Sequence, residues 1–170
     1  MPACIRWPPG SHTTARLERI AMTIGDFCVR NVVSTGRDAT VNEAAGLMRQ
    51  HHVGNVVVVD KGPDGAIPVG ILTDRDIVIE VVAAGLDARS ITVGELTQRP
   101  VATVREDTGY AETVRLMSAH GVRRMPVVNA KGVLVGIIAA DDILHQLVAP
   151  MVALSDLAVR GRHFEMQTRR

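Results

Sequence analysis

The chain has 170 residues, a length that suits one domain or two small equivalent halves. Its 46% hydrophobic content excludes disorder over most of the sequence. Only 2% of the residues are aromatic and the formal net charge is +1, so the chain lacks both the aromatic platform and the basic excess of nucleic-acid-binding proteins. We therefore expect no nucleic-acid partner.

The sequence also carries no signal for a membrane or an oxidising compartment. No segment reaches the roughly 18 uninterrupted apolar residues of a membrane-spanning helix, and residues 1–21 lack the apolar core of a signal peptide. The two cysteines, Cys4 and Cys28, form no C-x-x-C pair and have no accompanying ligand set for zinc. We predict a cytoplasmic protein with no membrane partner, no disulfide framework and no metal site.

The same unit occurs twice along the chain. When residues 22–59 are placed on residues 91–128, an offset of 69, 12 of the 38 positions are identical. After a three-residue insertion in the first copy, the offset becomes 66, and Val69-Gly70-Ile71 falls on Val135-Gly136-Ile137. This self-similarity over most of the chain indicates a duplicated structural unit.

Each copy predicts the same order of elements, β-α-β-β-α, and so an α/β (α+β) fold. A short apolar stretch (31–34 and 100–104) precedes a segment with helical spacing of apolar residues, then two apolar runs separated by a glycine-containing turn, then a second helical segment. A unit of about 60 residues is small for a core of its own, so we expect the two copies to share one. The predicted divisions are a leader that is a candidate for disorder (1–21), the two repeats (22–87 and 88–149) and a tail (150–170).

One candidate binding segment joins the last strand of the first repeat to its second helix. It reads G-I-L-T-D-R-D at 70–76, in which Thr73 and Asp76 can form a reciprocal capping box that needs no ligand. The same helix start also offers a hydroxyl and a carboxylate, and a carboxylate accepts two hydrogen bonds from a vicinal diol such as ribose. The second repeat has Ala139 in place of the threonine but keeps the aspartate as Asp142, which we interpret in favour of a ligand.

A second candidate lies at the start of a strand in the second repeat. The sequence R-R-M-P-V at 123–127 begins with Arg123 and Arg124, which are either a solvated strand end or a clamp for phosphate. The first repeat has Gly54 and Asn55 at these positions, so only one half carries the pair.

These features together resemble a tandem pair of CBS domains, the cystathionine β-synthase type repeat, arranged as a Bateman module over residues 22–149. The order T-D-R-D-I-V, A-A-G-L-D and G-E-L is similar to small stand-alone bacterial proteins of this family. The resemblance implies two repeats packed about a pseudo-twofold axis, with two clefts that bind AMP, ADP or ATP, or in some members S-adenosylmethionine. It also implies the site residues: Asp76 and Asp142 for ribose, Thr73, Arg123 and Arg124 for phosphate, and Val33, Val57, Ala102 and Pro126 for adenine.

The predicted function is a regulatory sensor module with no catalysis and no cofactor beyond an adenine nucleotide as regulatory ligand. The alternative is an interaction or oligomerisation protein with vestigial clefts, acting through the apolar tail segment 151–159. The resemblance further implies a homodimer, for which Ile79, Val82 and Leu147 are candidate contacts, and a regulated partner protein that the sequence does not name. An enzyme ranks last, because no nucleophile and base constellation can be assembled.

Overall fold

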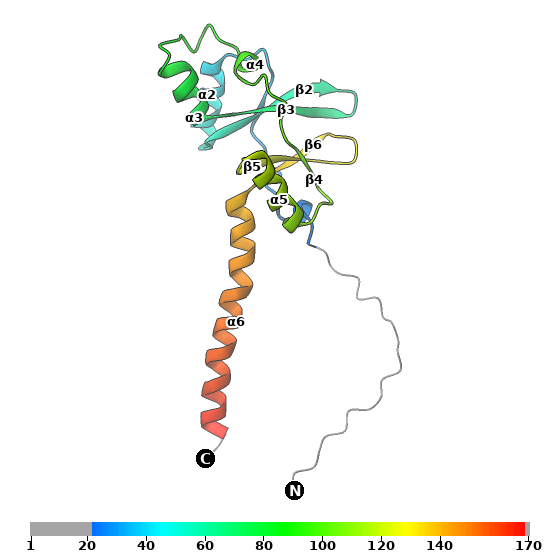
Figure 1. Cartoon of the computed structure of the whole chain (residues 1–170), viewed down its shortest axis with the longest axis vertical. Coiled ribbons are helices and arrows are strands. Elements are labelled where there is room, and N and C mark those ends of the chain that lie inside the picture. Colours follow the sequence, from blue (N-terminus) through cyan, green and yellow to red (C-terminus); the bar gives the residue numbers. More distant parts are fainter. Residues whose placement is uncertain (1–21, 169–170) are drawn as a thin grey trace.

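The protein is described by a computed structural model over residues 22–168; the predicted leader at 1–21 lies outside the described residues. Two small sheets lie one above the other, and a long C-terminal helix projects from the body (Figure 1). In chain order the elements are α1 (Ile24–Phe27), β1 (Ser34–Thr35), α2 (Val41–His51), β2 (Asn55–Gly62), β3 (Gly65–Thr73), α3 (Asp74–Asp76), the π-helix η1 (Ile77–Val82), α4 (Val93–Leu96), β4 (Val104–Arg105), α5 (Tyr110–His120), β5 (Arg124–Val128), β6 (Leu134–Ala139) and α6 (Ala140–Thr168).

The two repeats form three-stranded sheets of identical topology, β1-β2-β3 and β4-β5-β6. In each sheet the first strand runs parallel to the second, and the second runs antiparallel to the third. Ser34 pairs with Val57 in one sheet, and Val104 pairs with Val127 in the other. The predicted β-α-β-β-α order and the α+β class are confirmed. The first strands are shorter than predicted, only two residues each, and Pro100 in the second predicted stretch has no N–H to donate to a ladder.

Local sequence determines where several helices begin. Capping boxes pair Thr23 with Asp26, Thr40 with Glu43 and Thr92 with Glu95 at the starts of α1, α2 and α4. Hydrogen bonds from the backbone N–H of each threonine, and from its hydroxyl, hold the pKa of the partner carboxyl below its ordinary value. The short helices α1 and α4, which precede each repeat, therefore begin at the same kind of capping box as the longer helix α2.

The short helices are exchanged between the repeats. Helix α1 precedes the first repeat but bonds to the second, with Ile24 N–H donating to Thr108 O at 2.8 Å; helix α4 precedes the second repeat but bonds to the first, with Val93 N–H donating to Ala39 O at 2.8 Å. A second equivalent pair joins Gly25 to Glu106 and Gly94 to Arg37, at 2.8 and 2.9 Å. Each bond has its counterpart at the offset of 69, and this reciprocity is the pseudo-twofold symmetry that the resemblance implies.

The core consists of two clusters of buried side chains, one beside each sheet, and not of the single shared core that was expected. Exchange explains the difference, because each cluster is completed by the leading helix of the other repeat. The first contains Ala44, Met48, Val56, Val58 and Leu72 with Val93 of α4; the second contains Val104, Met117, Met125, Val127, Ile138 and Ile143 with Ile24 and Cys28.

Two glycines permit the close approach of the exchanged segments. A Cβ at Gly70 would lie 2.8 Å from the Cβ of Thr97, and a Cβ at Gly136 would lie 2.5 Å from the sulfur of Cys28. Both distances are too short for a side chain, so any larger residue must displace the exchanged segment. Burial against the strand raises the pKa of the Cys28 thiol, in keeping with a packing role.

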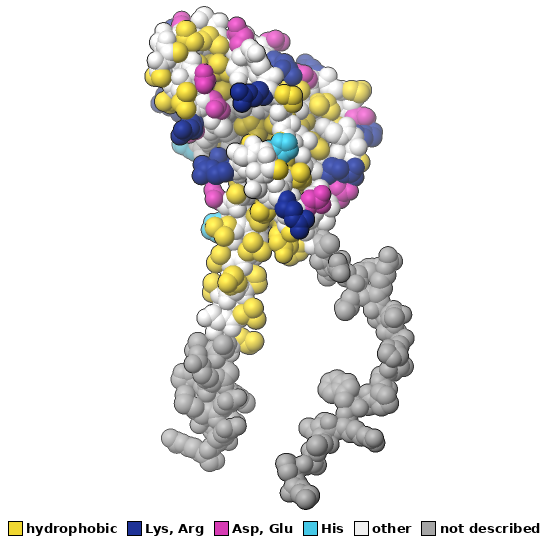
Figure 2. Space-filling view, in the orientation of Figure 1, with side chains coloured by type: hydrophobic (Ala, Val, Ile, Leu, Met, Phe, Trp, Pro, Cys, Tyr) yellow, Lys and Arg dark blue, Asp and Glu magenta, His cyan; other side chains and the backbone are white. Residues whose placement is uncertain are grey.

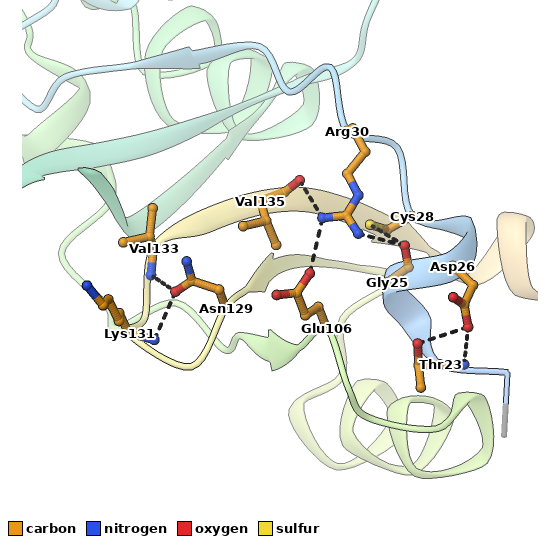
Figure 3. Close-up of polar contacts among 10 residues, drawn as sticks. All are labelled: Thr23, Gly25, Asp26, Cys28, Arg30, Glu106, Asn129, Lys131, Val133 and Val135. Carbon is orange, nitrogen blue, oxygen red and sulfur yellow. Dashed lines mark hydrogen bonds and ion pairs between the residues drawn. The ribbon is translucent and has the colours of Figure 1, made fainter. Parts of the chain in front are cut away.

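An arginine ties the first exchanged segment to the second repeat, as Figure 3 shows. Arg30 follows Cys28, and one of its terminal nitrogens lies 3.2 Å from a Glu106 carboxylate oxygen and 3.4 Å from the Val135 carbonyl oxygen. The other terminal nitrogen donates to the Gly25 carbonyl oxygen at 2.8 Å. The guanidinium therefore joins α1, the turn after β4 and the start of β6.

Helix α6 continues without a break from the end of β6 through the predicted boundary at residue 150. Pro150 lies inside it, where its missing N–H leaves the carbonyl of Gln146 without the usual helical donor. Apolar side chains are prominent along the described part of this helix beyond the body (Figure 2). None of the helices in the described part of the chain has both the length and the hydropathy needed to cross a bilayer.

Candidate functional site

The predicted residues of the first repeat gather at one end of its sheet. The Val57 N–H donates to the Val33 carbonyl at 3.0 Å, so the two predicted adenine contacts lie on adjacent backbone segments of the first repeat. Thr73 ends β3 opposite Asn55, and the next turn brings Asp76 back against it. Val57 is buried, whereas the other predicted residues are half-buried.

Thr73 and Asp76 form the capping box expected from the sequence. One Asp76 carboxylate oxygen, Oδ2, accepts the Thr73 hydroxyl at 2.6 Å and the Thr73 N–H at 2.9 Å, and the Asp76 N–H donates to the Thr73 hydroxyl oxygen at 3.2 Å. The second carboxylate oxygen of Asp76, Oδ1, accepts no hydrogen bond from any described residue. The capping role therefore leaves half of the carboxylate available.

The second repeat brings its arginines next to its aspartate. Arg124 pairs with Ala139 across β5 and β6, and the N–H of Ala140 donates to the Arg123 carbonyl at 2.9 Å. Asp142 lies in the first turn of α6, directly beyond this junction. Arg123 is exposed and Arg124 is half-buried, and neither guanidinium pairs with a carboxylate among the side chains that the structure describes. Both are thus free to meet an anion.

The two remaining predicted residues of this repeat lie in its sheet and core. Pro126 is buried opposite Ile137, and Ala102 packs against the second core cluster. The structure therefore places Thr73 and Asp76 of the first repeat at a junction where the last strand meets a helix, and does the same for Arg123, Arg124 and Asp142 of the second. The predicted adenine contacts lie along the sheets and are not joined to these junctions by any hydrogen bond among the described residues.

The interpretation of Asp142 needs correction. Its retention without a threonine partner favours a ligand on sequence grounds alone, yet its Oδ2 accepts the N–H of Ala139 at 2.9 Å, the same backbone bond that Asp76 accepts from Thr73. Capping the helix is thus sufficient to explain this aspartate. Its Oδ1, like that of Asp76, accepts no bond from a described residue.

Two open cavities are found elsewhere on the described surface, and none of the nine predicted residues lines either of them. One lies along α2 and includes Thr35, Glu43 and Gln50. The other, of about 280 Å³, lies between the start of β3 and the segment after α4. Among the side chains described, which exclude those of residues 158–168, no three from His, Cys, Asp or Glu are placed to hold a metal ion together.

The sequence does not predict the exchange of α1 and α4, or the close contacts that Cys28 and Thr97, directly after these helices, make with the last strand of the other repeat. The signal was present in the repeated glycines, because Gly70 and Gly136 occupy equivalent strand positions whose neighbours must approach closely. Nothing in the spacing says which repeat supplies that neighbour.

The duplicated sheets, the exchanged helices and the glycine-aspartate junctions define a tandem repeat fold, and comparison with known proteins names it. The family model for the CBS domain matches residues 24–83 and 93–149. The chain therefore belongs to the CBS-domain family, with two repeats.

Two curated relatives show how far the likeness extends. The protein MK0525 of Methanopyrus kandleri is 37% identical over 124 residues, which are 73% of this chain and 62% of that protein. Hypoxic response protein 1 of Mycobacterium tuberculosis is 38% identical over 125 residues, which are 74% of this chain and 85% of the relative.

Solved structures share the same arrangement. A crystal structure of Hypoxic Response Protein I, which holds two coordinated zinc ions, has a TM-score of 0.63 and 37% identity over 72% of this chain and 97% of that one. The hexameric CBS-CP12 protein from bloom-forming cyanobacteria has a TM-score of 0.65 and 30% identity, covering 74% and 67% of the two chains. The CBS pair of protein MJ0100, in complex with 5′-methylthioadenosine and S-adenosyl-L-methionine, has a TM-score of 0.63 and 26% identity, covering 74% and 98%.

Proposed function

We propose that this protein is a regulatory module that binds an adenine nucleotide at the sheet ends of its two CBS repeats and carries out no catalysis itself. The observation that carries the proposal is the pair of half-used carboxylates. Asp76 and Asp142 each spend one oxygen on a helix cap and present the other at the same junction. A vicinal diol supplies the two hydroxyl donors that such an oxygen accepts.

The phosphate contact is proposed for the second repeat. Arg124 lies on the strand beside Ala139, whose N–H is capped by Asp142, so the guanidinium and the carboxylate flank one junction. A guanidinium offers a planar fork to a phosphate. The complex of the MJ0100 pair with two adenosyl ligands supports an adenosine-containing ligand. The cytoplasmic setting and the regulated partner protein stay predictions.

Titration calorimetry of the full chain with AMP, ADP, ATP, S-adenosylmethionine and adenosine tests this function. We expect saturable heat with at least one nucleotide. We also expect adenosine to bind at least about tenfold more weakly than AMP, because adenosine lacks the charge-assisted bonds to the arginines. Binding of S-adenosylmethionine alone would keep the ribose contact but contradict the phosphate contact. The absence of heat with every adenosyl compound would contradict the function.

A second candidate function, assembly with another copy of this chain, is favoured by the apolar surface of α6. Leu144, Leu147, Met151 and Leu154 are exposed, the last two at 68% and 65%, and their 3-4-3 spacing matches the seam of a coiled coil. Ile79 and Val82 of η1 are exposed as well. The hexameric CBS-CP12 protein supports assembly in this family.

We expect the protein to be a dimer or larger at about 50 μM, a concentration that populates assemblies with micromolar dissociation constants. Light scattering after size exclusion measures this. Leu154→Glu places a charge in the seam and is expected to weaken assembly at least about tenfold, whereas Val114→Glu on the exposed face of α5 serves as the matched control. A wild-type monomer at this concentration, or equal effects of the two variants, would contradict the interface.

A further inference from the structure

A cavity of about 280 Å³ is lined by none of the residues assigned to the proposed nucleotide sites, although its Val101 directly precedes Ala102 in the chain. Its walls are the start of β3, at Pro68 and Val69, and residues 97–101 of the segment that leads from α4 to the second sheet. Arg37 lies on the wall as well, and the second segment contributes Arg99 together with the polar side chains of Thr97 and Gln98. Val69 precedes Thr73 by four residues of strand, which is about 13 Å at the usual rise per residue. The cavity is therefore distinct from the end of the sheet that Thr73 and Asp76 occupy.

The pseudo-twofold symmetry of the fold supplies an internal template for this cavity. At the offset of 69, Arg99 is equivalent to Arg30 and Arg37 is equivalent to Glu106. In the other half, the guanidinium of Arg30 lies 3.2 Å from the carboxylate of Glu106 and so has a counter-ion built into the fold (Figure 3). In the cavity, the carboxylate of the template is replaced by a second guanidinium.

The charges around the cavity are consequently unbalanced. The Nε atom of Arg37 donates to both carboxylate oxygens of Asp60, at 3.0 and 3.1 Å, so this arginine has a partner. Arg99 is exposed and forms no ion pair with any residue in the described part of the chain. One positive charge in the lining of a cavity with both apolar and uncharged polar walls thus lacks the anion that its symmetry mate has.

We propose that this cavity binds a small oxyanion, the carboxylate or phosphate group of a small molecule, in the place that Glu106 takes in the other half. Arg99 is the primary ligand, and the terminal nitrogens of Arg37 that Asp60 does not engage add a second donor group. The proline and valine walls contact the remainder of the molecule. Because the cavity lies between the first sheet and the segment leading into the second, its occupant contacts both repeats.

The test uses the full chain with sodium phosphate and sodium acetate as probes, at an ionic strength held constant with sodium chloride. Calorimetry and thermal unfolding are expected to show saturable binding of at least one probe. Saturation by phosphate alone assigns a phosphorylated ligand, and saturation by acetate assigns a carboxylate. The absence of saturable binding by both probes would overturn the proposal.

Four variants locate the anion. Arg99→Ala is expected to weaken binding at least about tenfold, through loss of a charge-assisted bond. Arg37→Glu recreates the Arg30 and Glu106 pair and is expected to abolish binding while the protein still unfolds cooperatively. Arg115→Glu, on the exposed surface of α5, makes the same charge change and is expected to leave binding unchanged. Loss of binding in Arg124→Ala with retention in Arg99→Ala would assign the anion to the nucleotide site and overturn the proposal.

Discussion

A fragment of residues 30–98 is expected to fold cooperatively as a monomer, whereas the sequence repeat itself, residues 22–87, is not. The fragment of residues 30–98 contains α4, whose Val93 belongs to the core cluster of the first sheet. The sequence repeat lacks this helix and instead retains α1, whose Ile24 belongs to the core of the absent second sheet. Urea unfolding followed by circular dichroism, at several protein concentrations, compares the two fragments.

The full chain provides the control for this prediction. Ile24→Ala removes a buried side chain from the exchanged helix and is expected to lower the free energy of unfolding by about 2–5 kcal/mol. Val114→Ala truncates a side chain at an exposed position of α5, outside the proposed interface, and is expected to change it by no more than about 0.5 kcal/mol. A monomeric, cooperative fragment 22–87, or equal losses in the two variants, would show that the exchange contributes nothing to stability.

Asp142→Asn is expected to weaken AMP and adenosine alike, by about tenfold or more, because both ligands carry the diol. The structure makes asparagine the informative substitution. Its side-chain oxygen still accepts the N–H of Ala139, so the cap on α6 is kept while the charge is lost. The neighbouring Asp141→Asn, on the exposed first turn of the same helix, is the matched control. Calorimetry with both ligands measures the difference.

Arg124→Ala is expected to separate the two ligands in the same assay. The affinity for AMP falls by about tenfold or more, while the affinity for adenosine stays unchanged, because only AMP presents a phosphate to the guanidinium. Wild-type affinity in a combined Asp76→Asn and Asp142→Asn variant would contradict the ribose contact. An equal loss of adenosine and AMP in Arg124→Ala would contradict the phosphate contact.

Much of the fold was predictable because the two repeats carry the same local signals. The helical spacing of apolar residues predicts the helix that follows the first strand of each repeat, and the apolar runs predict the strands that pair in each sheet. The exchange was not predictable, since Gly25 N–H to Glu106 O and Gly94 N–H to Arg37 O are backbone bonds over 81 and 57 residues, which side-chain periodicity does not encode.

The candidate site was predictable in its membership but not in its internal bonds. Sequence spacing indicated that Thr73 and Asp76 belong together, and the structure places them in hydrogen-bond contact. The same reasoning misjudged Asp142, because a missing hydroxyl was taken to remove the cap. In fact the bond that matters is donated by the backbone of Ala139, which every residue except proline can supply.

The exchange of α1 and α4 bears on how such a chain arises. Because each leading helix completes the other repeat, a single ancestral unit would bury its own leading helix by docking it on a second copy of itself, and would do so reciprocally. Gene duplication then converts that twofold dimer into one polypeptide that keeps these contacts. The segment between η1 and α4 joins the halves and also bonds to the start of α2, where the N–H groups of Val41 and Asn42 donate to the carbonyls of Ile91 and Ala88. Once they are joined in one polypeptide, the two halves no longer need to have the same sequence. A position such as Arg37 can then differ from its equivalent Glu106 and give one half a chemistry that the other half lacks, which two identical subunits cannot do.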